Sequence, residues 1–134
     1  MCSSDLVHRN VANVVHEKDD SIKAALDYAI NVLKVKHVVV CGHTRCGGVT
    51  AAMQEGEGVV HDWIRPIKTL YKDNQAEIQK YPTKDAQVEA LAVLSIQKSL
   101  AVIQSFAFLQ KGLSNIALHG WLFRLETGLI EEVV

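Results

Sequence analysis

Scarce cysteine and proline and the lack of a dominant charge are the first features of this 134-residue sequence. It contains 3 Cys, 2 Pro and 8 Gly, and 14 Lys and Arg nearly balance 15 Asp and Glu. So little Pro and Gly excludes collagen-like and disordered chains, and balanced charge provides no basic stripe for nucleic acid. The longest uncharged apolar run, residues 99–110, is too short for a membrane span. We therefore expect a soluble cytoplasmic protein, an organelle being the alternative, with no nucleic-acid or membrane partner.

Apolar residues make up 49% of the chain, enough for one core in a single domain over residues 1–134. Their spacing predicts an α/β fold with the order β-α-β-α-α-α-β-β. The first expected elements are a strand at 5–11, a helix from caps at 19–21 to residue 33, and a buried strand at 37–41 that ends at Gly42. Helices are expected next at 47–53 and 59–78, followed by a helical tract from Thr83 or Asp85 to Gly112 with a break near 99–105. The chain should end with an apolar strand at 115–119 and a hairpin of 121–125 with 129–134.

One segment carries most of the chemistry: Val-Val-Val-Cys-Gly-His-Thr-Arg-Cys-Gly-Gly at residues 38–48. The buried strand delivers His43 and Cys46 to a tight turn, and ligands bind at the carboxyl ends of strands in open α/β sheets. Imidazole and thiolate are both good zinc ligands. Gly47 and Gly48 let the backbone approach a substrate pocket and begin a helix whose positive end favours the thiolate. A packing role is the alternative interpretation of so short a pattern.

The segment resembles the β-class carbonic anhydrases, in which a strand ends in Gly-His-x-x-Cys-Gly-Gly and the His and Cys bind zinc. Three more stretches fit that family in order: His-Arg-Asn-Val-Ala-Asn at 8–13, Trp-Ile-Arg-Pro-Ile at 63–67, and Leu-His-Gly-Trp at 118–121 followed by Leu-Glu-Thr-Gly at 125–128. The resemblance covers about residues 5–134. It implies a mostly parallel sheet flanked by helices, a C-terminal hairpin, zinc as cofactor, and reversible hydration of CO₂ to bicarbonate.

Relative to that family, the chain looks shortened at its N-terminus and lacks the Cys-x-Asp-Ser-Arg motif. In the family this motif ends the first strand and supplies the third protein ligand and an Asp-Arg pair. Because that strand lies in the middle of the family's sheet, either residues 8–13 pair with the strand at 37–41 or another chain fills the gap. We expect a homodimer or higher oligomer, with a strand-swapped form among the alternatives.

The ligand set implied by the resemblance is incomplete, since catalytic zinc usually has three protein ligands and one open position. Cys2 is a spare thiol and a candidate third ligand, although it precedes the first expected strand and lies at that strand's opposite end from the site. His8, His16 or a partner's residue are other donors, and two protein ligands with additional waters are a further alternative. A water on the zinc, rather than a side chain, would perform the catalysis.

Other polar residues have stronger structural interpretations. Cys41 is interpreted as a small core residue at the end of a buried strand. His119 and Trp121 are interpreted as packing residues. The nearby candidates to replace the family's Asp-Arg pair, none of which has the family's spacing, are Asp5, Arg9 and Arg45.

The sequence therefore predicts a zinc-dependent carbonate dehydratase, with its activity retained, weakened or lost. A non-catalytic relative that binds or regulates a full-length carbonic anhydrase is the alternative, and attack on another small linear electrophile such as CS₂ is a third. An odd number of cysteines, two of them flanking a His, indicates a reducing compartment rather than a disulfide framework.

Overall fold

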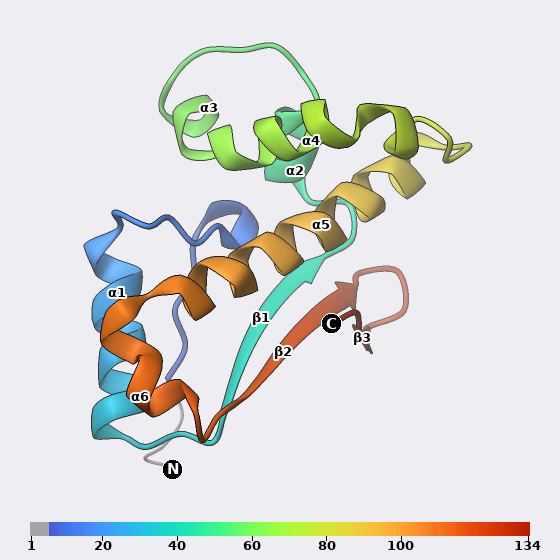
Figure 1. Ribbon diagram of the computed structural model, residues 1–134. Helices are drawn as coiled ribbons and strands as arrows, with labels where there is room; N and C mark the ends of the chain where they lie inside the picture. Colours follow the sequence, from blue (N-terminus) through green and yellow to red (C-terminus); the bar gives the residue numbers. More distant parts are fainter. Residues whose placement is uncertain (1–5) are drawn as a thin grey trace.

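The computed structural model of the chain describes residues 6–134 and shows an α/β fold (Figure 1). Its helices are η1 (Val11–Asn13), α1 (Asp20–Asp27), the π-helix η2 (Tyr28–Val32), α2 (Gly47–Ala52), α3 (Val59–Trp63), α4 (Arg65–Ile78), α5 (Lys84–Ser105), η3 (Ala107–Leu109) and α6 (Gln110–Leu113). Its strands are β1 (His37–His43), β2 (Ala117–Arg124) and β3 (Leu129–Glu132). The expected fold class is confirmed.

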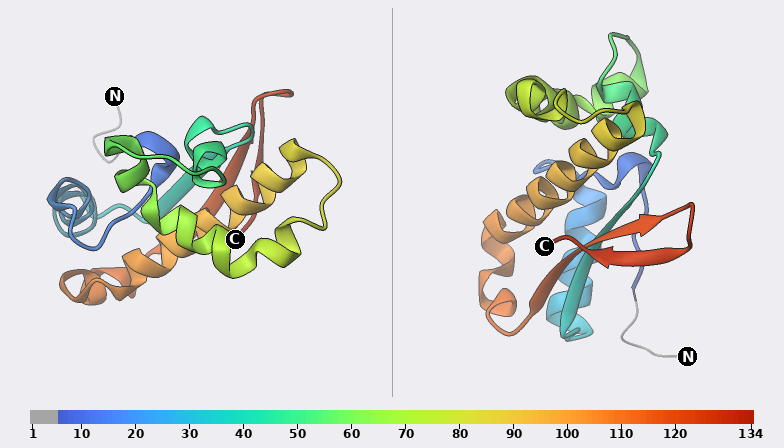
Figure 2. Two further views of the ribbon diagram at one scale, coloured as in Figure 1. Left: turned by 90° about the horizontal axis from the view of Figure 1, so that it is seen from above. Right: turned by 90° about the vertical axis from the view of Figure 1, so that its right-hand side faces the viewer.

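The three described strands form one sheet in the order β1-β2-β3. β1 runs parallel to β2, from the pair His37 and Ala117 to the pair His43 and Phe123, and β2 runs antiparallel to β3. Helix α5 lies along one side of β1 and β2, while the β2–β3 hairpin projects away from the helices (Figure 2, right). The expected C-terminal hairpin is confirmed, and β1 extends two residues beyond its predicted end at Cys41.

The two faces of the sheet differ in burial. Val40 and Leu122 point into the core against α5 and are 7% and 1% exposed. Alternation along β1 places His37, Val39 and Cys41 on the other face, and all three are exposed. The interpretation of Cys41 as a core residue is therefore wrong, because the helices cover only one face of this strand.

Two glycines allow α5 to lie close to the sheet. A Cβ on Gly42 would come within 2.9 Å of the Ile96 Cδ1 atom, and one on Gly120 would come within 2.7 Å of its Cγ2 atom. Ile96 itself is completely buried. The strands therefore have glycine, without a side chain, at the two positions that face Ile96, and this allows the close approach of the helix to the sheet.

The expected helix at 59–78 is two helices, α3 and α4, separated at Ile64. Pro66 has no N–H to donate to the carbonyl of Asp62, so one continuous helix would lose a hydrogen bond and meet a steric clash there. The expected break near residues 99–105 is confirmed at the end of that range, because α5 ends at Ser105 and the extended Phe106 separates it from η3. The Ser99 hydroxyl is satisfied by the Asn13 carbonyl at 3.2 Å, so this buried serine does not interrupt the helix.

The predicted strand at 5–11 is wrong for residues 6–11, and Asp5 lies outside the described residues. The segment is irregular and leads into η1, where Ala12 has a positive φ of 63°. The Asn10 side chain donates to the carbonyl of Val14 and accepts from its N–H, both at 3.0 Å. These local hydrogen bonds hold the segment in a turn rather than in a β-strand paired with a neighbour. Over residues 6–134, β1 is consequently bonded to β2 alone.

Helix α5 is long and apolar enough to cross a membrane by length and composition alone. Half of the qualifying stretch is buried inside the protein. Its buried residues include Leu91, Ile96 and Ile103, which belong to the hydrophobic core. Core helices of soluble proteins pass the same test, so this property is explained by packing.

Candidate metal site

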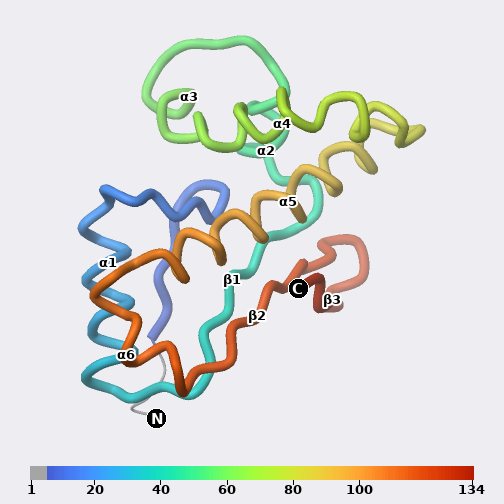
Figure 3. The backbone as a smooth tube through the Cα atoms, in the orientation of Figure 1, coloured from blue at the N-terminus to red at the C-terminus, as the bar shows by residue number. Residues whose placement is uncertain are grey.

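A short loop leads from β1 into α2 (Figure 3), and the candidate ligands His43 and Cys46 lie at its two ends. His43 is the last residue of β1, and Cys46 is the residue that precedes α2. Between them, Arg45 has a φ of 54°, the left-handed conformation that turns the chain sharply. The loop thus places an imidazole and a thiol at the carboxyl end of a parallel strand, as predicted.

The His43 ring is held by one hydrogen bond to the backbone. Its Nδ1 atom lies 2.7 Å from the Thr44 carbonyl oxygen. A carbonyl only accepts, so Nδ1 carries the proton and Nε2 of the neutral ring keeps its lone pair. Metal-binding histidines usually donate their second ring N–H to a carbonyl or carboxylate in this way. The ring is therefore prepared to bind a metal through Nε2.

Cys46 is buried, with 4% of its surface exposed. Its carbonyl accepts from the Thr50 N–H at 2.9 Å and from the Thr50 hydroxyl at 2.8 Å, which fixes the first turn of α2. The backbone of this cysteine is therefore immobilised on the same loop as His43. Together the two residues supply nitrogen and sulfur, the donor atoms that suit zinc.

Thr44, between the two candidate ligands, anchors the loop to the hairpin, and nothing in the sequence indicated this role. Its N–H donates to the Phe123 carbonyl at 2.9 Å, and its hydroxyl donates to the Glu126 carboxylate at 2.7 Å. The same hydroxyl accepts from the Leu125 N–H at 3.0 Å. Thr44 is 4% exposed, so these contacts are made in a buried position.

A charged cluster extends this anchor. Arg124 hydrogen-bonds to Glu131 and to Glu89 of α5, and both contacts raise the pKa of its guanidinium. The hydrogen bond from Thr44 is the largest of the effects that hold the pKa of Glu126 below its ordinary value. The loop with the ligands, the hairpin and α5 are thereby linked through polar side chains.

The lowered pKa of Glu126 makes part of the stability dependent on pH. Since the folded pKa lies below the unfolded one, this contribution is present above the unfolded pKa and is lost as pH falls through the folded pKa. We expect Glu126→Gln to lower the melting temperature at neutral pH, with the difference from wild type vanishing in acid. Glu57→Gln, at an exposed loop carboxylate, is the matched control. A difference for Glu126→Gln that is constant with pH would contradict this role.

The other candidate zinc donors lie elsewhere or outside the described residues. His8 contacts the Ser21 hydroxyl at 3.0 Å, and His16 contacts the Trp63 carbonyl at 2.8 Å. Cys2 lies outside the described residues. Within residues 6–134, no group of three or more His, Cys, Asp or Glu side chains is placed to hold one metal ion.

The two glycines after Cys46 have different surroundings. A Cβ on Gly47 would have no atom within 4 Å, so this residue borders open space. A Cβ on Gly48 would lie 2.8 Å from the Ala12 Cβ and 3.2 Å from the Val11 Cγ1 atom. Gly48 therefore admits η1 against α2, a close approach that the sequence did not reveal.

The candidates for a replacement Asp-Arg pair do not form one in the described chain. Arg45 pairs with Asp85 at 3.5 Å in an exposed position, Arg9 is exposed, and Asp5 lies outside the described residues. His119 and Trp121 are half-buried on the sheet face opposite α5, with ring centroids 6.4 Å apart.

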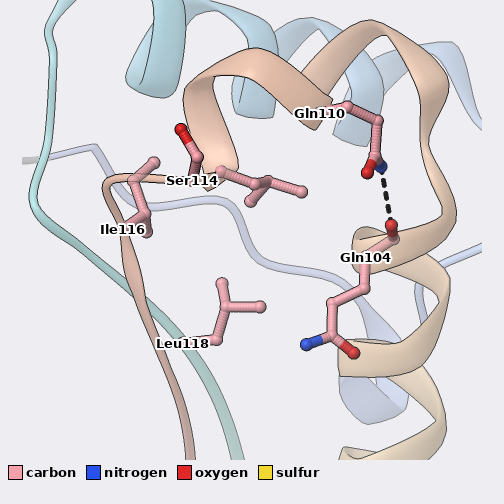
Figure 4. A pocket seen from close by; sticks show the side chains of 6 residues that line it. Gln104, Gln110, Ser114, Ile116 and Leu118 are labelled. Atoms are coloured by element: carbon pink, nitrogen blue, oxygen red, sulfur yellow. Dashed lines mark hydrogen bonds between the residues drawn. The ribbon is translucent and has the colours of Figure 1, made fainter.

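Two hollows of the described structure are lined by neither His43 nor Cys46. One of about 650 Å³ lies near the start of β2 and is lined by Gln104, Gln110, Leu113, Ser114, Ile116 and Leu118 (Figure 4). In it, the Gln110 amide donates to the Gln104 carbonyl at 2.7 Å. The other, of about 310 Å³, is lined by residues 14–18 and by side chains of α4 and α5.

The fold is that of an α/β protein with an imidazole and a thiol at the carboxyl end of the parallel strand β1. The sequence model of the family described as "Carbonic anhydrase" matches residues 4–130. The chain therefore belongs to the β-carbonic anhydrase family, as its motifs indicated.

Individual relatives agree with this assignment. The chain is 35% identical over 131 residues to a carbonic anhydrase of Emericella nidulans and 33% identical over 133 residues to one of Candida albicans. Each match covers 95% of this chain, but only 58% and 47% of those proteins. The chain thus spans about half the length of these relatives.

Solved structures show the same fold. The β-carbonic anhydrase CafA of Aspergillus fumigatus matches with a TM-score of 0.89 and 34% identity over 93% of this chain and 61% of that one. A β-carbonic anhydrase of Sordaria macrospora, described as tetrameric, matches with a TM-score of 0.89 and 32% identity over 93% of this chain and 66% of that one.

Proposed function

We propose that this chain binds zinc through His43 and Cys46 and catalyses the reversible hydration of CO₂ to bicarbonate. The observation that carries the proposal is the His43 ring, whose Nδ1 proton is committed to the Thr44 carbonyl. This arrangement leaves Nε2 free beside a loop that also holds Cys46. Membership of the carbonic anhydrase family supplies the reaction.

The residues present fit zinc, because imidazole and thiolate are both preferred by this ion. Two protein ligands leave further positions for a third donor and for solvent. The candidates for the third donor remain Cys2, a residue of a partner subunit, or water. A reducing compartment such as the cytoplasm would keep the Cys46 thiol available.

When bound, zinc supplies the Lewis acidity that allows water to lose a proton near neutral pH. The chain's own residues do the rest. The Thr44 carbonyl orients His43, burial shields the Cys46 sulfur from solvent, and the open space at Gly47 gives a small linear substrate room to approach. Gly48 shapes the same region indirectly, by fixing η1 against α2.

We further propose that the site is completed in an assembly of at least two chains. Among residues 6–134, no strand is bonded to the outer edge of β1, and β1 has neither Pro nor Asp, Glu, Lys or Arg to block pairing there. A strand from a second copy would satisfy these backbone groups, as in a strand-swapped dimer. The Sordaria relative is described as tetrameric, so an assembly larger than a dimer is also consistent with this proposal.

Stopped-flow hydration of CO₂ by tag-free protein with measured zinc content tests the proposal. We expect hydration above the buffer rate that is proportional to zinc content and is removed by His43→Ala. Sedimentation of the same sample should give at least twice the chain mass. Buffer-level rates at full zinc occupancy would overturn the catalytic proposal and favour the non-catalytic alternative. A sample that is monomeric at all concentrations would overturn the assembly.

A further inference from the structure

A second group of imidazoles lies on the sheet face that α5 leaves bare. The His37 Nδ1 atom of β1 lies 3.0 Å from the His119 Nε2 atom of β2. The other ring nitrogen of His119 lies 3.1 Å from the Glu132 carboxylate of β3. Three neighbouring strands thus place two imidazoles and one carboxylate in a row, at the end of β1 opposite His43.

The proton positions in this row follow from its chemistry. The Glu132 carboxylate only accepts, so His119 carries its proton on Nδ1 and directs the lone pair of Nε2 toward His37. With His119 Nε2 as the acceptor, the hydrogen bond of 3.0 Å is donated by the Nδ1–H of His37. When the proton of the neutral His37 ring moves to its Nε2, the lone pairs of both histidines face the point that this proton occupied. Two lone pairs 3.0 Å apart repel each other unless a proton or a cation lies between them.

The spacing suits a metal ion. Zinc lies about 2.0–2.1 Å from histidine nitrogen, so two nitrogens on one ion in tetrahedral geometry are roughly 3.3 Å apart. The present separation of 3.0 Å reaches this value by a small rotation of His37, whose side chain is exposed. The carboxylate behind His119 also matches the usual carboxylate–histidine–metal arrangement.

We propose that His37 and His119 form a second, accessory site for a divalent transition-metal ion, with Glu132 orienting His119 from behind. Zn²⁺, Ni²⁺ and Cu²⁺ are the ions that imidazole pairs favour. Solvent fills the remaining positions, because no third side-chain ligand is placed there in residues 6–134. The site binds reversibly and more weakly than a site with three protein ligands, and it is independent of the proposed function at His43 and Cys46.

Titration with Zn²⁺ of the full chain, already carrying any tightly bound zinc, tests this site. Calorimetry gives the stoichiometry, and the ¹⁵N resonances of the histidine rings identify the nitrogens that bind. We expect wild type to bind one weak zinc with shifts at His37 Nδ1 and His119 Nε2. His37→Ala should remove this event, and circular dichroism checks that this change at an exposed position leaves the fold intact.

Two further variants make the result specific. Glu132→Gln should weaken binding by about 10- to 100-fold, the usual effect of changing an outer-sphere carboxylate. His61→Ala, a histidine of α3 outside the sheet, should leave the weak event unchanged. The proposal is overturned if wild type shows no weak event, or if His37→Ala and His119→Ala bind the added zinc as wild type does. A sample that carries no tight zinc at His43 should still bind the weak zinc at His37 and His119, so failure of the proposed function is distinguished from failure of this site.

Discussion

We expect Cys46→Ser to abolish the zinc binding proposed for His43 and Cys46 in the purified chain. Serine is close in size to cysteine, so the buried position is retained while the thiolate ligand is lost. We expect zinc affinity to fall by more than about 100-fold, beyond the range seen when only an outer-sphere partner changes. Elemental analysis after dialysis against a weak chelator measures the effect, and His43→Ala should behave in the same way.

Cys41→Ser is the matched control for this experiment. It makes the same chemical change five positions earlier in the chain, on the exposed face of the sheet. Its zinc content should equal that of wild type. Cys2→Ser, measured beside it, decides whether Cys2 is the third ligand. Equal zinc content in wild type and Cys46→Ser would remove the basis of the proposed site.

Gly48→Ala destabilises the fold by about 1–3 kcal/mol, the usual range for overpacking a buried contact. The added methyl group would lie 2.8 Å from the Ala12 Cβ. Ala12 cannot rotate this atom away, because a Cβ is fixed to the backbone. Its φ of 63° is already an unfavourable conformation for alanine, so η1 must move as a unit. Urea unfolding gives the free energy directly.

Gly47→Ala is the adjacent control, since a Cβ there has no atom within 4 Å. It should stay within about 1 kcal/mol of wild type, because alanine is compatible with the start of a helix. Adding Ala12→Gly to Gly48→Ala should restore stability, as it removes both the contact and the left-handed alanine. Equal effects of Gly47→Ala and Gly48→Ala would show that the contact with η1 has no energetic importance.

Most of the fold could be predicted from residue patterns. The apolar stripe after Asp19, the Val-Val-Val run of β1 and the Glu-Thr-Gly turn before β3 all led to elements that the structure contains. The errors fell where a single residue overrides the pattern. Pro66 divides a helix whose apolar spacing continues through it.

The N-terminal segment could not be predicted from its own residues. Val7 and Val11 are β-branched and favour a strand, yet a strand requires a neighbour with free backbone groups in register. In the described chain, residues 6–10 are not bonded into the sheet, although β1 has an edge without a partner strand there. The local hydrogen bonds of Asn10 determine the conformation instead. The strand propensity of a residue depends on the neighbours against which it packs, and the spacing of residues in the sequence does not show which neighbours will be there.

The candidate site was predictable in part. His43 and Cys46 were identified from their spacing after a buried strand, and the structure holds both on one loop. Thr44 was not, because its contacts with Glu126 and Leu125 join residues that are about 80 positions apart. Long-range polar contacts of this kind leave no periodic pattern, so only the folded chain reveals them.

The absorption spectrum of the Co²⁺-substituted protein tests the central claim most directly. Cobalt takes the place of zinc in sites of this kind, and a thiolate ligand produces an intense sulfur-to-cobalt charge-transfer band in the near ultraviolet. The account predicts this band in wild type and in Cys41→Ser, and its loss in Cys46→Ser. A wild-type spectrum with no thiolate band, or a band that survives in Cys46→Ser, would show that Cys46 is not a metal ligand.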